Sequence, residues 1–217
     1  MKKIINNYIN GLKVSISSKT LPVEDPSTGE IVAEVTLSSK DDFNKVIESS
    51  KNSQNEWSNT TPLKRSRVLS NYKNLIEKNI DELAEIVSIE HGKTFADAKG
   101  SVTRGLEVVE FACGIPHLLK GEFSQNVGTN IDSWSVRQPL GICAGITPFN
   151  FPAMVPMWMY PIAIACGNAF ILKPSEKDPS CSLRLAELFS EAGLPDGVFN
   201  VINGDKNIVQ LILDSKE

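Results

Sequence analysis

The stretch GICAGITPFNFPAMVPMWMYPIAIACGNAFILKPSE, residues 141–176, carries the strongest fold signal in the chain. It contains two short apolar runs, residues 141–146 and 169–172, that are typical of buried strands. Between them, residues 152–166 predict an apolar helix that ends at a glycine. A strand, a helix and a strand on short connections indicate neighbouring strands of a parallel sheet.

The same alternation continues to the end of the chain. Asp178 and Pro179 predict a helix start, with Asp178 as N-cap and the helix closing at residue 193. A third strand is predicted at residues 198–202. The fold class is therefore α/β with a doubly wound parallel sheet. Because open sheets usually contain about 4–6 strands, we expect this segment to be an incomplete part of a larger domain.

The preceding residues predict mostly helices and a projecting ribbon. Residues 1–36 have the pattern of short strands and turns, and four helical segments follow, at residues 39–51, 61–79, 81–91 and 95–119. Residues 121–138 alternate around Gly128 as a protruding β-ribbon does. We divide the chain accordingly into residues 1–120, the ribbon at 121–138, and the first part of a nucleotide-binding sheet at 139–217.

Composition excludes several functional classes. The 217 residues carry a net charge of −4 and are 41% hydrophobic, as in ordinary globular proteins, so neither nucleic acid nor an anionic membrane is an expected partner. The four cysteines lack CxxC spacing, which argues against a metal site and favours a reducing, cytoplasmic location. The N-terminus does not resemble a signal peptide. The apolar run 151–172 contains three prolines, so we expect a helix and a strand rather than a membrane span.

Two polar groups follow the predicted strands, where ligands of parallel sheets bind. Lys173 could reach a ribose hydroxyl or a phosphate, and Glu176 could accept from ribose hydroxyls while repelling a 2′-phosphate, which favours NAD over NADP. A solvated Lys–Glu pair is the alternative. Asn150 could cap the next helix, or its amide could face a developing oxyanion. The chain contains no GxGxxG motif, so an ordinary Rossmann phosphate loop is not expected.

Three motifs together resemble the aldehyde dehydrogenase family: TPFNFP at 147–152, GNAFILKPSE at 167–176 and EAGLPDGVFNVING at 191–204. The resemblance covers nearly the whole chain and aligns it with the N-terminal part of that fold. Phe149, where most members carry Trp, and RGLEVVEFACGIPHLLKGE from Arg104 resemble one branch in particular. That branch oxidises methylmalonate or malonate semialdehyde and transfers the acyl group to coenzyme A.

The resemblance implies roles for seven residues. Asn150 matches the amide of the oxyanion hole. Arg104, which interrupts an apolar helix face, matches an arginine that holds the substrate carboxylate; a surface ion pair with Asp97 or Glu107 is the alternative. The remaining residues match cofactor-binding positions: Thr147, Phe149, Lys173, Glu176 and Lys177.

The resemblance also implies NAD as cofactor, coenzyme A as co-substrate, a small semialdehyde as substrate, and a homotetramer or homodimer assembled through the ribbon. The nucleophilic cysteine of the family lies beyond residue 217, and the four cysteines present are expected to be inert, so the segment alone is expected to be inactive. His91 and His117 are interpreted as incidental helix-end residues. Two alternatives stay open: a hydrolytic member such as a succinate-semialdehyde dehydrogenase, and a nucleotide-binding module without chemistry.

Overall fold

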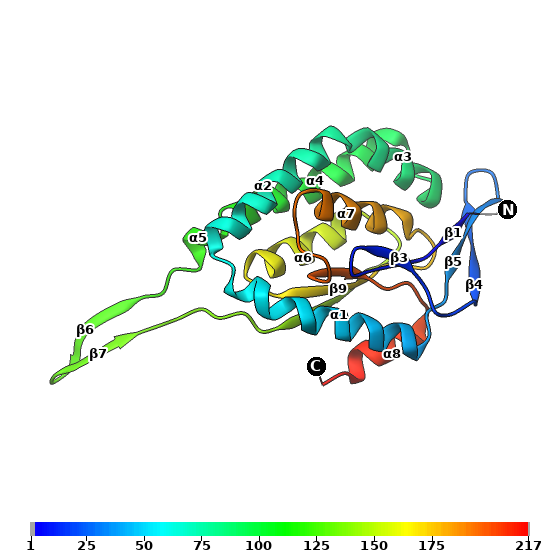
Figure 1. Ribbon diagram of the computed structural model, residues 1–217. Coiled ribbons are helices and arrows are strands. Elements are labelled where there is room, and N and C mark those ends of the chain that lie inside the picture. The colour runs from blue at the N-terminus through cyan, green and yellow to red at the C-terminus, as the bar shows by residue number, and fades with distance from the viewer. Residues whose placement is uncertain (1–2, 217) are drawn as a thin grey trace.

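A computed structural model describes residues 3–216 of the chain, which form an α/β body with a long projecting ribbon (Figure 1). The central sheet has the strand order β3-β2-β10-β9-β8. Its strands are β2 (Asn7–Ile9), β3 (Leu12–Val14), β8 (Ile142–Ile146), β9 (Ala169–Lys173) and β10 (Phe199–Val201). The neighbours β8, β9 and β10 are parallel, as the sequence predicts.

Two strands from the N-terminal part of the chain complete this sheet. The sequence predicts short strands there, but it does not predict that they join the parallel strands. β2 pairs antiparallel with β10, and β3 pairs antiparallel with β2. Each spans only three residues, too few to show an alternation. A smaller sheet, β1-β5-β4, lies beside it. Its strands are β1 (Ile4–Ile5), β4 (Thr20–Asp25) and β5 (Glu30–Thr36).

Helices cover both faces of the central sheet. On one face, α1 (Lys40–Asn59) and α8 (Lys206–Asp214) enclose a small apolar cluster that includes Phe43, Ile171 and Ile208. On the other face, α6 (Met154–Ala165) packs on β9 and α7 (Ser180–Glu191) packs on β10. An outer layer then packs on α6 and α7; it consists of α2 (Pro62–Lys78), α3 (Ile80–His91) and α4 (Phe95–Cys113).

The helix starts follow local sequence signals in most cases. Ser39 and Asp42 form a capping box at α1, and Thr61 with Pro62 opens α2. The helix predicted at 95–119 is divided, however: α4 ends at Cys113, and a short α5 (Ile115–Leu118) follows. Pro116 cannot donate a main-chain hydrogen bond, which explains why the helix does not continue.

The start of α7 corrects the prediction for Asp178. Its N-cap position is Pro179, and no side chain within α7 caps the helix. The main-chain N–H of Ser180 donates instead to Glu90 Oε2 of α3, at 2.9 Å. The cap is therefore supplied by a residue 90 positions away, a tertiary contact that local spacing cannot reveal.

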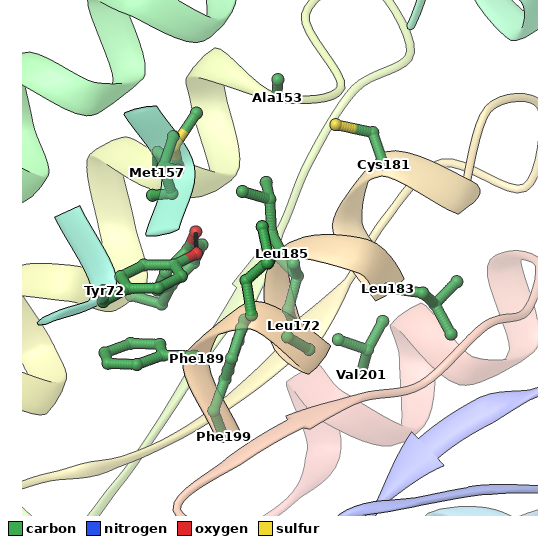
Figure 2. Packing of buried hydrophobic residues seen from close by; sticks show 14 of the residues in the cluster. Tyr72, Ala153, Met157, Leu172, Cys181, Leu183, Leu185, Phe189, Phe199 and Val201 are labelled. Atoms are coloured by element: carbon green, nitrogen blue, oxygen red, sulfur yellow. Dashed lines mark hydrogen bonds between the residues drawn. The ribbon is translucent and has the colours of Figure 1, made fainter. Parts of the chain in front are cut away.

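An aromatic cluster forms the centre of the main core (Figure 2). Tyr72 stacks on Phe189 with ring centroids 4.0 Å apart, and Tyr160 stacks on Phe199 at 4.4 Å. The hydroxyls of Tyr72 and Tyr160 lie 2.6 Å apart, and both side chains are fully buried. This pair joins α2 to α6 by a hydrogen bond within an apolar environment.

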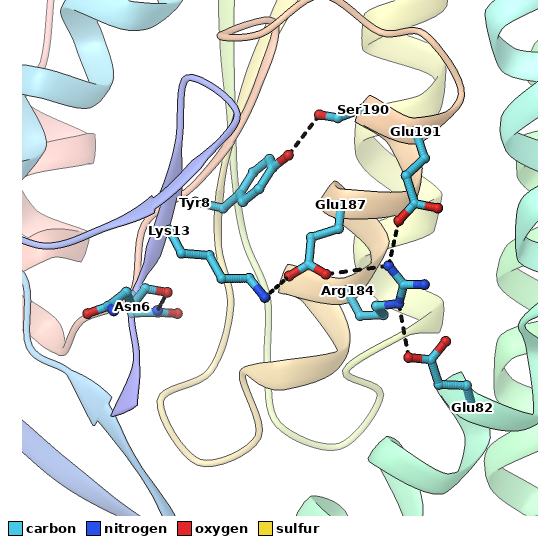
Figure 3. Close-up of polar contacts among 9 residues, drawn as sticks. Asn6, Tyr8, Lys13, Glu82, Arg184, Glu187, Ser190 and Glu191 are labelled. Carbon is cyan, nitrogen blue, oxygen red and sulfur yellow. Dashed lines mark hydrogen bonds and ion pairs between the residues drawn. The ribbon is translucent and has the colours of Figure 1, made fainter. Parts of the chain in front are cut away.

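Polar contacts join α7 to its neighbours at the surface (Figure 3). Arg184 contacts Glu82 of α3 and also Glu187 and Glu191 of its own helix. Tyr8 of β2 donates to Ser190 Oγ at 2.9 Å, while Lys13 of β3 pairs with Glu187. Exposed ion pairs stabilise proteins only modestly, so we regard these contacts as aligning α7 rather than as a main source of stability.

The predicted ribbon is present as β6 (Phe123–Gly128) paired antiparallel with β7 (Ile131–Trp134). It projects away from the body, and its large apolar side chains are exposed; Trp134, for example, is 71% exposed. None of the helices within residues 3–216 combines the length and apolar character that a membrane span requires. The apolar run 151–172 is instead divided between α6 and β9, as predicted.

We predict that Tyr72→Phe and Tyr160→Phe each destabilise the chain by about 1–3 kcal/mol, because each leaves one buried hydroxyl without a partner. The double variant is expected to cost less than the sum, since it leaves no unpaired hydroxyl. Urea unfolding of the four proteins measures this. If the two single losses in unfolding free energy simply add in the double variant, the two hydroxyls do not depend on each other. Tyr8→Phe is the control, because its partner Ser190 is only partly buried and keeps access to water.

Candidate functional site at the carboxyl ends of β8 and β9

The loops that follow β8 and β9 begin side by side. Ile146 is paired with Lys173 in the parallel register, so both strands end at the same level of the sheet. The N–H of Thr147 then donates to the carbonyl of Lys173 at 3.1 Å, which extends the pairing by one residue. The loop at 147–152 and the loop at 174–179 therefore form one surface, as the sequence interpretation requires.

Lys173 is a buried cation. Its side chain is only 5% exposed, and its Nζ lies 2.8 Å from Glu176 Oε2, whose side chain is 35% exposed. Burial alone would raise the pKa of Glu176, but the hydrogen bond and charge of Lys173 outweigh it, and the pKa is lowered. The sequence also allows a solvated Lys–Glu pair without a ligand. The pair is formed, but Lys173 is buried in it and Glu176 is only partly exposed.

Thr147 lies beside this pair and carries an unused hydrogen-bonding group. The residue is 5% exposed, and its Oγ1 has no partner among the described residues. Buried hydroxyls are usually paired, so an orphan at the end of a parallel strand is a position where a ligand can bond.

Phe149 and Lys177 connect the two loops. The Lys177 Nζ lies over the Phe149 ring, 4.7 Å from its centroid, and both side chains are exposed. Together they line a cavity of about 450 Å³ that reaches Pro22 and His91. The lining of this cavity does not include Lys173, Thr147 or Asn150.

Asn150 is exposed and does not cap α6, since that helix begins at Met154 with Ala153 in the N-cap position. The structure therefore removes the structural alternative for Asn150. Its main-chain carbonyl accepts a hydrogen bond from Lys93 Nζ at 3.0 Å, and the same ammonium lies 4.5 Å from the centroid of the Phe151 ring. Sequence reasoning does not identify Lys93, because the contact spans 57 residues.

Arg104 lies on α4 with its side chain exposed. Among the described residues it forms neither of the ion pairs weighed as alternatives, with Asp97 or Glu107; Asp97 bonds to Thr94 at the start of α4 instead. Within residues 3–216 no hydrogen bond or ion pair joins Arg104 to the two loops, so the structure does not itself link Arg104 to Asn150.

Two buried carboxyl groups, Glu90 and Asp178, line the cavity behind Phe149. Asp178 is 2% exposed and its Oδ1 has no partner among the described residues. Burial raises the pKa of Asp178 to about 7, and the charge of Glu90 adds to the rise. Burial likewise raises the pKa of Glu90. The sequence gives Asp178 only a capping signal, so its buried carboxyl is a feature that the sequence interpretation misses.

The four cysteines are unsuited to nucleophilic catalysis. Burial raises the pKa of the thiols of Cys113, Cys143 and Cys166, and it does so most strongly for the fully buried Cys181. Thiolates are the reactive form, so burial disfavours reaction at each of these thiols, in line with the expectation from the sequence. Within residues 3–216, no group of three or more His, Cys, Asp or Glu residues could hold a metal ion.

Comparison with known proteins places these loops in a family. The model of the aldehyde dehydrogenase family matches residues 14–217. A malonate-semialdehyde dehydrogenase of Pseudomonas aeruginosa is 53% identical over 213 residues, which are 98% of this chain and 43% of the relative. The acylating, mitochondrial methylmalonate-semialdehyde dehydrogenase of Arabidopsis thaliana is 48% identical over 214 residues, 98% of this chain and 35% of the relative.

A solved structure agrees with these relatives. It is that of a Sinorhizobium meliloti protein assigned as a methylmalonate-semialdehyde dehydrogenase and complexed with NAD. It superposes with a TM-score of 0.97 at 53% identity and covers 99% of this chain and 44% of that one. The chain thus spans less than half the length of the relatives it matches.

We predict that Asp178→Asn stabilises the chain at pH 8. The unfolded carboxyl has a pKa of about 3.9, whereas the folded one titrates at about 7. Between these values only the folded state keeps the proton, so this group's contribution to stability falls as pH rises from about 4 to about 7. The gain is expected to be about 1–4 kcal/mol at pH 8 and small at pH 4.

Thermal unfolding at pH 4, 6 and 8 measures this difference. Glu85→Gln, at an exposed position of α3, is the control and should alter the pH dependence little. A variant Asp178→Asn that is less stable than the parent at pH 8 would show that the carboxylate is stabilised by contacts instead.

Proposed function

The chain belongs to the aldehyde dehydrogenase family, and on that premise we propose that it supplies the cofactor and oxyanion sites of a CoA-acylating semialdehyde dehydrogenase. The proposed reaction converts methylmalonate semialdehyde, NAD⁺ and coenzyme A into propionyl-CoA, CO₂ and NADH. Malonate semialdehyde would give acetyl-CoA in the same way. The proposal is supported by the names of the relatives and by one structural observation: the paired ends of β8 and β9 unite Lys173 with the Asn150 loop.

Lys173 at the end of β9 and Glu176 after it fit the ribose of NAD. NAD, when bound, would accept the hydride that the aldehyde loses. Lys173 can donate to a ribose hydroxyl while Glu176 accepts from one, and their mutual hydrogen bond holds both groups ready. The negative charge of Glu176 disfavours a 2′-phosphate. Thr147 Oγ1 has no hydrogen-bond partner among the described residues and could bond to the cofactor. Phe149 offers the cofactor an apolar surface, and Lys177 offers it a positive charge.

Asn150 is proposed to stabilise the oxyanion. When a thiolate adds to the aldehyde carbon, the carbonyl oxygen gains negative charge, and a positioned amide N–H lowers the energy of that state. Its exposed side chain is free for this role, because it does not cap α6. None of the four cysteines of this chain is suited to be the thiolate, so the proposal assigns the nucleophile to sequence outside this segment.

Arg104 is proposed to hold the carboxylate of the semialdehyde. A guanidinium binds a carboxylate through two parallel hydrogen bonds, and that of Arg104 is exposed and forms neither of the ion pairs weighed as structural alternatives. A carboxylate β to the acyl carbon is also the group lost as CO₂ in the proposed reaction. Its recognition therefore separates these substrates from simple aldehydes.

The β6–β7 ribbon is proposed to join subunits into a homodimer or homotetramer. Its exposed apolar side chains, Phe123, Val127, Ile131 and Trp134 among them, form a surface that a separate protein would not normally leave uncovered. An edge of this kind pairs readily with a second chain.

A chimera tests the proposed function. Residues 1–217 would replace the matched segment of the Pseudomonas aeruginosa enzyme, and NADH formation from malonate semialdehyde would be followed with and without coenzyme A. We expect CoA-dependent activity from the chimera, none from residues 1–217 alone, and a loss of about 10²–10³ in kcat on Asn150→Ala. A folded chimera that is inactive, or whose activity is independent of CoA or indifferent to Asn150→Ala, would contradict the proposal.

In the same chimera, we predict that Arg104→Leu raises KM for malonate semialdehyde by about tenfold or more, since a bidentate carboxylate contact is lost. The KM for propanal, which has no carboxylate, should change little. Equal effects on both substrates would refute the role of Arg104. Arg67→Leu, at an exposed position of α2, is the control for loss of a surface cation.

A further inference from the structure

We propose that Lys93 is a positioning residue that holds Asn150 in place for catalysis. The inference rests on the proposed oxyanion role of Asn150. It arises from two contacts of one ammonium: Lys93 Nζ donates to the main-chain carbonyl of Asn150 at 3.0 Å and lies over the Phe151 ring at 4.5 Å. Lys93 thus contacts the residue that carries the amide and the residue that follows it.

The main chain of Lys93 is itself firmly held. Gly92 ends α3 in the left-handed region, with φ of +82°, and its N–H donates to the carbonyl of Ser88. Ser88 Oγ then donates to the carbonyl of Lys93 at 2.8 Å, and Thr94 caps α4 directly afterwards. Lys93 is therefore the single residue between the C-cap of α3, Gly92, and the N-cap of α4, Thr94, so its side chain starts from a fixed point.

Asn150 lies in the loop between β8 and α6, and its side chain is exposed. Besides Lys93, the imidazole of His91 also faces the main chain of Asn150. The carbonyl of Phe151 accepts from the N–H of Val155 at 3.3 Å, but that bond holds only the far side of the loop. Because an oxyanion donor acts only at the correct distance and angle, an exposed amide needs its main chain to be held in place. The Lys93 ammonium supplies that constraint.

The groups around Lys93 act on its ammonium in opposite directions. Partial burial lowers the pKa of Lys93, while the charges of the Asp178 and Asp97 carboxyl groups oppose that shift. The three N–H groups of Lys93 remain available for the Asn150 carbonyl and for the face of Phe151. His91, interpreted from the sequence as incidental, also faces the Asn150 main chain, and burial followed by the charge of Lys93 lowers its pKa. A lowered pKa favours the neutral imidazole of His91, so the positive charge beside the Asn150 carbonyl is that of Lys93.

The test is a double-mutant cycle in the chimera described above. Lys93→Met keeps the length of the side chain and removes the N–H donors, and Lys93→Arg keeps a donor and a cation over Phe151. We expect Lys93→Met to lower kcat by about 10- to 100-fold with less than about twofold change in KM for NAD, because the loop shifts while the ribose site does not. Lys93→Arg should restore most of the activity.

The Asn150→Ala background separates positioning from a general structural role. There Lys93→Met should lower the remaining kcat by less than about twofold, since no amide is left to position. Lys99→Met, which breaks a surface ion pair with Asp81, is the matched control and should leave kcat unchanged in both backgrounds. Melting temperatures of all variants are measured alongside, and Lys93→Leu, which also lacks N–H donors, replaces Lys93→Met should the latter fail to fold.

The outcomes distinguish the two proposals. An equal loss from Lys93→Met in both backgrounds, or a parallel loss of NAD affinity, would overturn the positioning role and leave the oxyanion role of Asn150 intact. If Lys93→Met has no effect although Asn150→Ala is strongly impaired, Lys93 is likewise excluded. If Asn150→Ala is fully active, both the oxyanion role and the inference built on it are wrong.

Discussion

The parallel pairing of β8 with β9 is the constraint on which the rest of the site depends. The register that places Ile146 opposite Lys173 ends both strands at one level, and the bond from Thr147 N–H to the Lys173 carbonyl carries the pairing into the first loop. Side chains that are 26 residues apart in the chain thereby share one edge of the sheet. The aromatic core beneath, in which Tyr160 of α6 bonds to Tyr72 of α2, holds the crossover helix between the two strands in place.

Three lysines contact the loops at 147–152 and 174–179, each through a different interaction. Lys173 is buried against Glu176, Lys177 lies on the face of Phe149, and Lys93 contacts the main chain of Asn150. Two buried carboxyl groups, Glu90 and Asp178, line the same cavity as Phe149 and Lys177.

Local patterns in the sequence predict the parallel strands, most helix starts and the positions of Lys173 and Asn150, because each depends on neighbouring residues. Features that depend on distant contacts are not predicted. Strands β2 and β3 are three residues each and join the sheet through contacts such as Asn10 N–H to Asn200 Oδ1 at 2.9 Å. Asp178 has the spacing of an N-cap, but Glu90 takes that role, and burial gives Asp178 a different character. The contact of Lys93 with Asn150 likewise has no local signature.

We propose that the ends of β8 and β9 form a nucleotide site in which Lys173 binds the ribose. Equilibrium titration of the chimera with NADH, comparing Lys173→Met with the parent, measures the contribution of Lys173 to binding. We expect the dissociation constant to rise about tenfold or more, as for loss of a charge-assisted hydrogen bond. An unchanged dissociation constant would contradict the proposal.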